Sequence, residues 1–289
     1  MLRVAALIRL ALLYLFVSSV ALLTWVSYEH APGALIVAFL DVGQGDAIYI
    51  ESPTGRQVLI DGGKSRDVLA ELSRVMPLFD RSIDILINTH PDMDHIGGLP
   101  HVLERYHVAH VLDSGLEGDT EAFAFYAEEL QHEIRSGALY HEARRGDVID
   151  IGGGAYLRIL FPDRDMASTT DANNASIVAQ LVYGETEALL TGDAPKSVEE
   201  YLVLLDGDTL ESAILKAGHH GSKTSSAEGF VRVVRPQYAV ISAGCDNSYG
   251  HPHKEVVKTF AAASSAILST CEHGTIVFKS DGADLILKK

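Results

Sequence analysis

Cysteine is scarce in this chain, and positive charge is in deficit. Only Cys245 and Cys271 occur among 289 residues, which excludes a disulfide-dense scaffold and a cysteine-rich zinc site. Lysine and arginine number 23 against 39 aspartate and glutamate residues, a formal net charge of −16. This charge repels a polyanion at long range and disfavours a protein that coats nucleic acid. The deficit is uneven, because residues 1–210 hold 14 basic and 32 acidic side chains, whereas residues 211–289 hold 9 and 7.

Long apolar runs are also rare, and one stands out near the amino terminus. Residues 10–28 contain no charged side chain, and as a helix these 19 residues would be close to the ~30 Å hydrocarbon thickness of a bilayer. Arg3 and Arg9 precede the run, and Trp25 and Tyr28 end it, as expected for a cytoplasmic flank and a far interface. We expect residues 1–33 to form a cytoplasmic stub, a transmembrane anchor and a linker.

The alternative for this segment is a cleaved signal peptide. Ser19-Val20-Ala21 resembles a small-x-small cleavage site, although the apolar run continues beyond it. Under either reading, residues 34–289 would lie outside the cytoplasm, anchored to the membrane or secreted. The two cysteines could then be oxidised, and their pairing is left open.

After residue 33, short apolar or alternating segments predict strands between segments with helical spacing. We therefore expect one α/β domain at residues 34–289, with two sheets flanked by helices. The expected strands are 35–40, 47–51, 57–60, 83–88, 108–112, 156–161, 177–182, 188–190, 238–242 and 276–278, and the expected helices are 66–76, 97–106, 120–135, 195–205, 225–234 and 253–263.

A dense group of potential ligands follows the strand expected at residues 83–88. His90, Asp92, Asp94 and His95 fall within six residues, and such groups at a strand end need solvent or a cation to compensate them. His90 and Asp92 can point to the same side of an extended segment, while Asp94 and His95 open the next helix. The pattern predicts two metal ions held close together. A solvated turn capped by Asp94 is the alternative, and it leaves both histidines unexplained.

This cluster resembles a known signature. His90-x-Asp92-x-Asp94-His95 is similar to the His-x-His-x-Asp-His motif of the metallo-β-lactamase superfamily, with aspartate in place of the second histidine. Followed by Gly97-Gly98, it resembles the lactamase-like hydrolase domain of ComEC-type competence proteins, whose multi-helix channel has no counterpart in this sequence. The resemblance implies an αββα sandwich. The further matching blocks are FLDVGQGDA at 39–47, IDGG at 60–63, NNAS at 173–176, TGD at 191–193, LKAGHHGS at 215–222 and NSYGHP at 247–252.

The resemblance also implies a site for two divalent metals. The implied ligands are His90, Asp92, Asp94, His95, Asp193, His219 and His220. The first two would bind one metal and the next two the other, with Asp193 as the bridging carboxylate. One of His219 and His220 would complete the second metal, and the other would hydrogen-bond a substrate oxygen, so catalysis would depend on both of them and on Asp94. The alternative for Asp193 is an N-cap on the helix expected at 195–205.

Several other residues are expected around the site. Asp61 would orient a ligand imidazole. His251 and His253 are expected to cap the last helix and line the pocket without binding metal. Ser222 lacks the context of a catalytic serine, so hydrolysis would proceed without a protein nucleophile. The remaining candidates for supporting or substrate contacts are Asn174, Ser176, Lys216, Ser222 and Lys223.

The metals and the reaction follow from the same resemblance. An oxygen-rich ligand set shifts the preference from zinc toward manganese or magnesium, while availability outside the cytoplasm favours zinc. We expect a metal-dependent phosphodiesterase or nuclease that acts through a metal-activated water. The alternatives are an amide, lactam or ester hydrolase and a non-catalytic binding domain. The acidic charge favours a DNA end or an envelope phosphodiester over a long duplex, and no protein partner is predictable.

Overall fold

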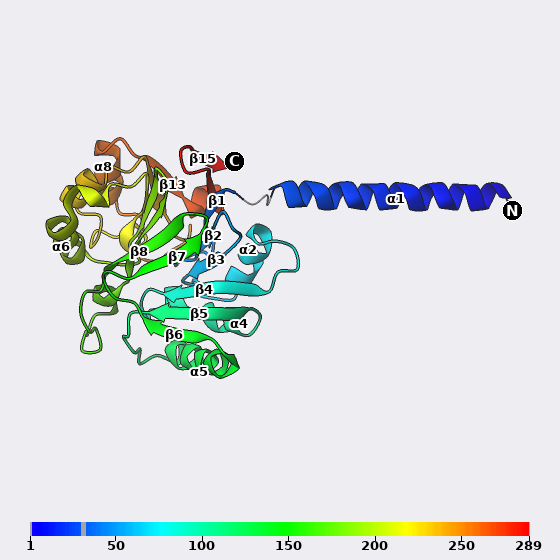
Figure 1. Ribbon diagram of the computed structural model, residues 1–289. Coiled ribbons are helices and arrows are strands. Elements are labelled where there is room, and N and C mark those ends of the chain that lie inside the picture. Colours follow the sequence, from blue (N-terminus) through cyan, green and yellow to red (C-terminus); the bar gives the residue numbers. More distant parts are fainter. Residues whose placement is uncertain (1, 30–32, 289) are drawn as a thin grey trace. The chain divides into compact units, whose positions relative to one another are not determined.

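The computed structural model describes the backbone of residues 2–29 and 33–288 (Figure 1). Side chains are described for residues 8–21 and 33–288. Internal contacts divide the chain into two units, Met1–Gly33 and Ala34–Lys289.

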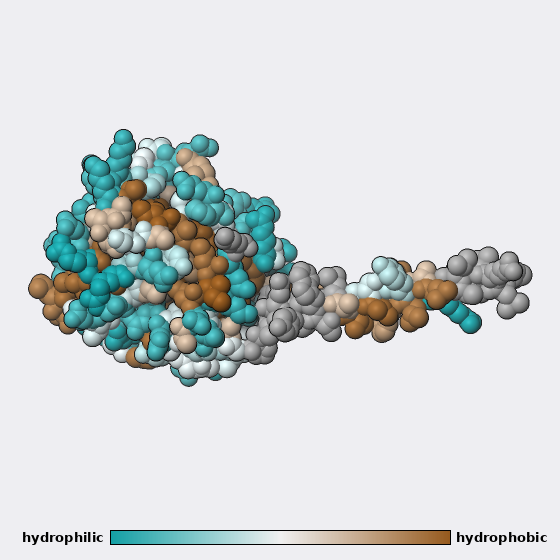
Figure 2. Space-filling view, turned by 90° about the horizontal axis from the view of Figure 1, so that it is seen from above, coloured by the Kyte–Doolittle hydropathy of each residue, from teal (hydrophilic) through white to brown (hydrophobic). Residues whose placement is uncertain are grey.

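The first unit is the helix α1 (Leu2–Glu29), which includes the whole uncharged run. Its described side chains, from residue 8 to residue 21, are all exposed, and they are largely apolar (Figure 2). The side chains of Trp25 and Tyr28 lie outside the described residues, as do residues 30–32 of the predicted linker. Within the described part of the chain, no helix combines the length and hydropathy needed to cross a bilayer.

The second unit is built on two sheets (Figure 1). The first has the order β15-β14-β1-β2-β3-β4-β5-β6, and the second β13-β12-β11-β10-β9-β8-β7. Strands β3 to β6 run parallel to one another, as do β10 to β13. The strands of the first sheet are β1 (Leu35–Phe39), β2 (Ile48–Glu51), β3 (Gln57–Ile60), β4 (Ser82–Asn88), β5 (His107–Asp113), β6 (Leu139–Glu142), β14 (Ile276–Ser280) and β15 (Leu285–Lys288). Those of the second are β7 (Val148–Gly152), β8 (Ala155–Phe161), β9 (Val178–Tyr183), β10 (Thr186–Leu190), β11 (Ile214–Lys216), β12 (Tyr238–Ile241) and β13 (Ala266–Ser269).

Three apolar layers hold this unit together. Side chains such as Phe39 and Leu157 fill the space between the sheets. The outer face of the first sheet packs on α2 to α5, and that of the second packs on α6 to α8 (Figure 1). The expected αββα sandwich is therefore confirmed. The helices are α2 (Val68–Val75), α3 (Met93–Ile96), α4 (Leu99–Leu103), α5 (Glu121–Ser136), α6 (Lys196–Asp206), α7 (Glu228–Val234), α8 (Lys254–Ala262) and α9 (Thr270–His273), with 3₁₀ turns η1 (Ala172–Ala175), η2 (Gly207–Leu210) and η3 (Gly218–Gly221).

The predicted elements are present with shifted ends, but five strands were not predicted. Strands β6 and β7 form sheet edges, and all four residues of β6 are exposed, so no buried face marks that strand in the sequence. Strand β11 has only three residues and ends in a lysine. The other two are β13 and β15. The predicted helix 97–106 is wrong in its extent, because α3 and α4 are separate short helices around Gly97 and Gly98.

Candidate metal centre

Four buried side chains from distant parts of the sequence meet at one edge of the sandwich. They are Asp46, His95, Asp193 and His220, and one ligand atom from each lies within 4.8 Å of the others. Asp46 lies between β1 and β2, His95 is in α3, Asp193 follows β10, and His220 is in η3. Because β3 and β4, and likewise β10 and β11, run parallel, the loops at their carboxyl ends converge here.

Asp61 fixes the orientation of His95. The Nδ1 of His95 lies 2.7 Å from Asp61 Oδ2, and an ionised carboxylate only accepts, so Nδ1 carries the proton. Thr89 donates to the same carboxylate through its backbone N–H at 2.8 Å and its hydroxyl at 2.7 Å. The Nε2 of His95 then lies 3.3 Å from Asp193 Oδ2. This is the position that the sequence assigns to Asp61.

His220 is held in the same tautomer by a backbone carbonyl. Its Nδ1 lies 3.0 Å from the oxygen of Ser242, which can only accept. Its Nε2 lies 3.2 Å from Asp94 Oδ2 and 3.3 Å from Asp193 Oδ2. The structure therefore brings Asp94, His95, Asp193 and His220 together, and their role as metal ligands stays a prediction.

His90 occupies a neighbouring position in the centre. Its Nδ1 lies 3.0 Å from Thr89 Oγ1 and 3.3 Å from Ser176 Oγ. Because the Thr89 hydroxyl donates its proton to Asp61, its oxygen is free to accept from the His90 Nδ1–H. The Nε2 of His90 faces Asp92 Oδ2 at 3.6 Å. The pair His90 and Asp92 thus lies together, as the motif predicts.

The imidazole nitrogens and carboxylate oxygens of the centre suit divalent metal ions. The Nε2 atoms of His90, His95 and His220 are buried, and none has a hydrogen-bond partner among the described residues. A buried acceptor without a partner costs about 1–3 kcal/mol, and a cation would relieve all three. The carboxylates of the centre belong to Asp46, Asp61, Asp92, Asp94 and Asp193. Among the described residues one lysine, Lys216, forms ion pairs with these carboxylates, so two divalent ions would balance the local charge.

Lys216 lies behind the centre rather than at its mouth. Its side chain is fully buried, and its ammonium group forms an ion pair with Asp46, lies 3.5 Å from Asp193 Oδ1 and donates to the carbonyl of Gly192 at 3.0 Å. Burial alone would lower the pKa of Lys216, but Asp46 and Asp193 outweigh it and raise the pKa. Lys216 was a candidate either for supporting the metal ligands or for contacting substrate. Its burial behind the carboxylates favours the first role.

His219 lies on the open side of the centre. Its side chain is 28% exposed, and its Nε2 lies 3.8 Å from Asp193 Oδ2. Its Nδ1 lies 2.9 Å from Thr224 Oγ1, which donates in turn to Ser222 Oγ. Burial lowers the pKa of His219. A neutral ring that donates from Nδ1 leaves Nε2 as an acceptor facing the mouth of the site.

The alternative role of Asp193 as a helix cap does not agree with the structure. Pro195 is the N-cap of α6, and both carboxylate oxygens of Asp193 face the centre. Among the other candidates, Ser176 accepts from the Asp193 N–H. Asn174 is half-buried and Lys223 exposed, and within the described residues neither side chain forms a hydrogen bond or ion pair with the cluster.

The sequence prediction missed Asp46, although the block that contains it was recognised. A signal was present in Gly45, which has φ of 129° and whose absent Cβ would lie 2.1 Å from the carbonyl oxygen of Asp94. Only glycine lets this loop approach α3 so closely, and the following residue is thereby brought into the centre. His253 is the N-cap residue of α8, as expected, but its side chain makes no capping hydrogen bond.

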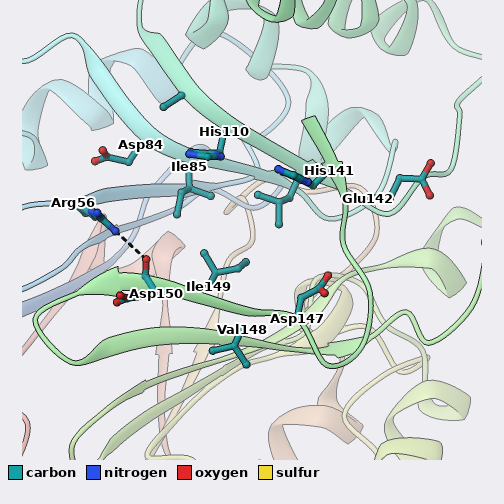
Figure 3. A pocket seen from close by; sticks show the side chains of 12 residues that line it. Arg56, Asp84, Ile85, His110, His141, Glu142, Asp147, Val148, Ile149 and Asp150 are labelled. Carbon is teal, nitrogen blue, oxygen red and sulfur yellow. Dashed lines mark hydrogen bonds between the residues drawn. The ribbon is translucent and has the colours of Figure 1, made fainter. Parts of the chain in front are cut away.

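A cavity of about 550 Å³ lies away from the metal centre and shares no residue with the cluster. It opens between β5, β6 and β7, and His110 and His141 face it with their rings stacked 6.3 Å apart (Figure 3).

The fold and the Asp/His cluster define a class that comparison with known families identifies. The chain belongs to the metallo-beta-lactamase superfamily, whose model matches residues 40–244. More particularly, it is 32% identical over 262 residues to ComE operon protein 3 of Bacillus subtilis (strain 168), covering 84% of this chain and 33% of that protein. It is also 31% identical over 246 residues to competence protein ComA of Neisseria gonorrhoeae, with 84% and 32% covered. The resemblance to the ComEC-type domain is confirmed, and the chain spans about a third of the length of these relatives.

Solved structures with the same fold are more distant in sequence. A metallo hydrolase from Ignicoccus hospitalis, Igni18, matches with a TM-score of 0.53 and 14% identity over 85% of this chain and 98% of that one. CmlA, a diiron β-hydroxylase from Streptomyces venezuelae, matches with a TM-score of 0.53 and 14% identity over 83% and 53%. These likenesses establish the fold alone. The superfamily membership and the Asp/His cluster together support a metal-dependent hydrolase.

Proposed function

We propose that this chain is a phosphodiesterase or nuclease that uses two divalent metal ions, manganese or zinc. The observation that carries the proposal is the convergence of the His95 and His220 Nε2 atoms on the Asp193 carboxylate, with the buried Nε2 of His90 beside Asp92. The names of two relatives refer to competence and to recombination, which favours a substrate related to DNA. The carboxylates Asp92 and Asp94 favour phosphorus over a lactam carbonyl, because hard oxygen ligands suit the metals of phosphoryl chemistry.

Different residues of the site would bind the metals, orient the ligand imidazoles and transfer protons. When bound, the metals supply charge neutralisation at the phosphate and activation of water at neutral pH. His90 and Asp92 would hold one ion, and Asp94, His95 and His220 the other, with Asp193 between them. Asp61 and Ser242 hold the ligand imidazoles in the required tautomer. His219, with an accepting Nε2 at the open side, is placed to take a proton from the attacking water or to return it to the leaving oxygen.

The test is a substrate panel with the full-length chain in manganese, zinc or magnesium. The panel contains bis-p-nitrophenyl phosphate, single- and double-stranded DNA, and a chromogenic cephalosporin. We expect metal-dependent phosphodiester cleavage and a preference for strand ends, since residues 1–210 carry the whole of the acidic excess. Cephalosporin cleavage without phosphodiester cleavage would instead identify a lactam hydrolase, and no cleavage with metals bound would favour a binding domain.

We also propose that α1 attaches the chain to a membrane, with Ala34–Lys289 outside the cytoplasm, although no described helix has the length and hydropathy of a membrane span. The support is the row of exposed apolar side chains between residues 8 and 21, among them Leu10 at 63% and Phe16 at 65% exposure. A second support is the disulfide between Cys245 and Cys271, since disulfides persist in oxidising compartments. A reporter active only outside the cytoplasm, fused after Lys289, tests the orientation. Reporter activity only in the cytoplasm would contradict it, and a soluble, shortened chain would indicate signal cleavage.

A further inference from the structure

A second cavity of about 330 Å³ opens beside the metal centre, and Asp94 belongs to both. Its walls come from three loops that the fold brings together. The lining residues are Gln44, Lys64, Met93, Asp94, Asp246, Asn247, Ser248 and Tyr249. The proposed reaction does not use the part of this cavity beyond Asp94. Its lining offers one aromatic ring, one thioether, one ammonium group, two carboxylates and three amide or hydroxyl groups, a mixture that suits a ligand with a flat apolar part and a polar part.

Tyr249 offers a free aromatic face in this cavity. The residue is 64% exposed. One face of its ring is stacked on His251, with centroids 5.6 Å apart and planes 24° apart. The His251 ring in turn contacts that of His219, 5.7 Å away at the metal centre. A row of three rings thus leads from the centre to the cavity, and the outer face of Tyr249 is available for stacking.

The loop that carries Tyr249 is braced rather than loose. The side chain of Asn247 donates to the carbonyl oxygens of Gly244 at 2.7 Å and of His251 at 2.8 Å, and it accepts from the His251 N–H at 2.9 Å. The disulfide between Cys245 and Cys271 ties the start of the loop to α9. A side chain on such a loop loses little freedom when a ligand binds, which favours affinity.

The charged part of a ligand would meet Lys64. This lysine is exposed, and among the described residues its ammonium group forms no ion pair, although the carboxylates of Asp94 and Asp246 line the same cavity. It extends from the loop after β3, on the side of Asp94, while Met93 adds an apolar surface that is 45% exposed. A phosphate beside the scissile one would therefore lie near a free cation, and a flat group between Tyr249 and Met93.

We propose that this cavity binds the nucleoside next to the scissile phosphate, with the base stacked on Tyr249 and a neighbouring phosphate near Lys64. The proposal rests on the proposed phosphodiesterase function and narrows its substrate to nucleotides. Aromatic stacking accepts every base, so we expect little sequence preference. A single stacking position also agrees with a short or single-stranded substrate rather than a duplex gripped along its length.

The test compares two esters that share a leaving group, p-nitrophenyl thymidine 5′-phosphate and methyl p-nitrophenyl phosphate, which lacks the nucleoside. Tyr249→Ala should lower kcat/KM about tenfold for the nucleoside ester, mainly through KM, and leave the methyl ester within about twofold. Tyr249→Phe should retain most of the activity. Phe79→Ala, which removes an exposed ring at the other end of β4, is the matched control and should change neither.

A binding measurement separates this proposal from the proposed function. Calorimetry should show that Tyr249→Ala weakens thymidine 5′-monophosphate about tenfold, with inorganic phosphate unaffected. Lys64→Gln should reduce the salt dependence of cleavage of a short single strand by about one charge. Equal losses on both esters, or no loss on either, would overturn the nucleoside site even if the chain is a phosphodiesterase. A wild-type chain that cleaves neither ester would instead overturn the proposed function.

Discussion

His219 and His220 are adjacent in sequence, yet their rings lie at 74° to each other with centroids 6.1 Å apart. Both residues adopt left-handed backbone angles, with φ of 49° and 54°. This conformation is unfavourable for residues with a side chain, and such strain is retained where the surrounding structure requires it. The turn sends His220 into the buried centre and leaves His219 at its mouth.

Replacement of the two histidines should therefore affect metal affinity and kcat differently. His220→Ala should lose metal affinity and activity together, because it removes a buried ligand nitrogen that lies between Asp94 and Asp193. His219→Ala should retain metal affinity within a few-fold and lose about 10²–10⁴ in kcat, the usual contribution of a general acid or base. Metal titration and steady-state kinetics on both variants distinguish the cases. Equal loss of metal by both variants would contradict the division of roles.

Asp61→Asn tests whether the buried carboxylate acts through His95. An asparagine side chain offers one accepting oxygen, whereas the carboxylate accepts from His95 and twice from Thr89. The expected result is a metal affinity about 10–100-fold weaker, measured by competition with a chelator. Asp67→Asn, at an exposed aspartate before α2, is the control. An unchanged affinity in Asp61→Asn would show that the tautomer is fixed by other contacts.

Asp61 and His95 show which features of the site can be predicted from the sequence and which cannot. Asp61 follows a recognisable strand and precedes the glycine turn Gly62-Gly63, so a short motif was enough to place it near a ligand. The identity of its partner was not predictable, because His95 lies 34 residues away and their contact depends on how β3 and β4 pair. The same applies to Asp46 and Lys216, whose ion pair joins β1–β2 to β11 across the two sheets.

The edges of the sheets were harder to predict than the site. Exposed strands such as β6 lack the alternation that a buried face imposes, and the pairing of Cys245 with Cys271 depends on the approach of two distant loops. Motif residues could be identified because their chemistry restricts the choice of side chain. Edge strands have no such restriction.

Lys216→Met should destabilise the metal-free protein. The change leaves the Asp46 carboxylate buried beside Asp193 without its fixed cation, and removal of one partner of a buried ion pair costs about 3–5 kcal/mol. Saturating manganese should restore part of the loss, because the added ions neutralise the same carboxylates. Urea unfolding with and without metal measures this effect. Lys254→Met, at an exposed lysine, should have no effect, and equal stability of the two variants would contradict the role of Lys216.

Glu199 should give the unfolding free energy a pH dependence independent of the metal centre. Burial raises the pKa of Glu199 to about 7, against the opposing effect of two backbone N–H groups, those of Ala227 and Ser226. Since the pKa is higher in the folded state than the ordinary 4.5, the stabilisation is complete below about pH 4.5 and is lost as the pH rises through 7. The loss amounts to about 3 kcal/mol.

Denaturant unfolding of the wild type and Glu199→Gln between pH 4.5 and 8 isolates this contribution. The difference in unfolding free energy between the two proteins should change by about 3 kcal/mol over that range. Glu200→Gln, at the exposed neighbour, should follow the wild type. A constant difference for Glu199→Gln would mean that the two backbone donors hold the carboxylate ionised throughout.

The most direct test of the central claim is a calorimetric manganese titration of the full-length chain, followed by assay of the same samples with bis-p-nitrophenyl phosphate. We predict about two ions bound per chain and phosphodiester cleavage that rises with metal occupancy. The Asp193→Ala variant should lose both metal binding and cleavage. Tight metal binding without cleavage would contradict the phosphodiesterase function. Cleavage that persists in Asp193→Ala or in excess chelator would contradict the metal centre itself.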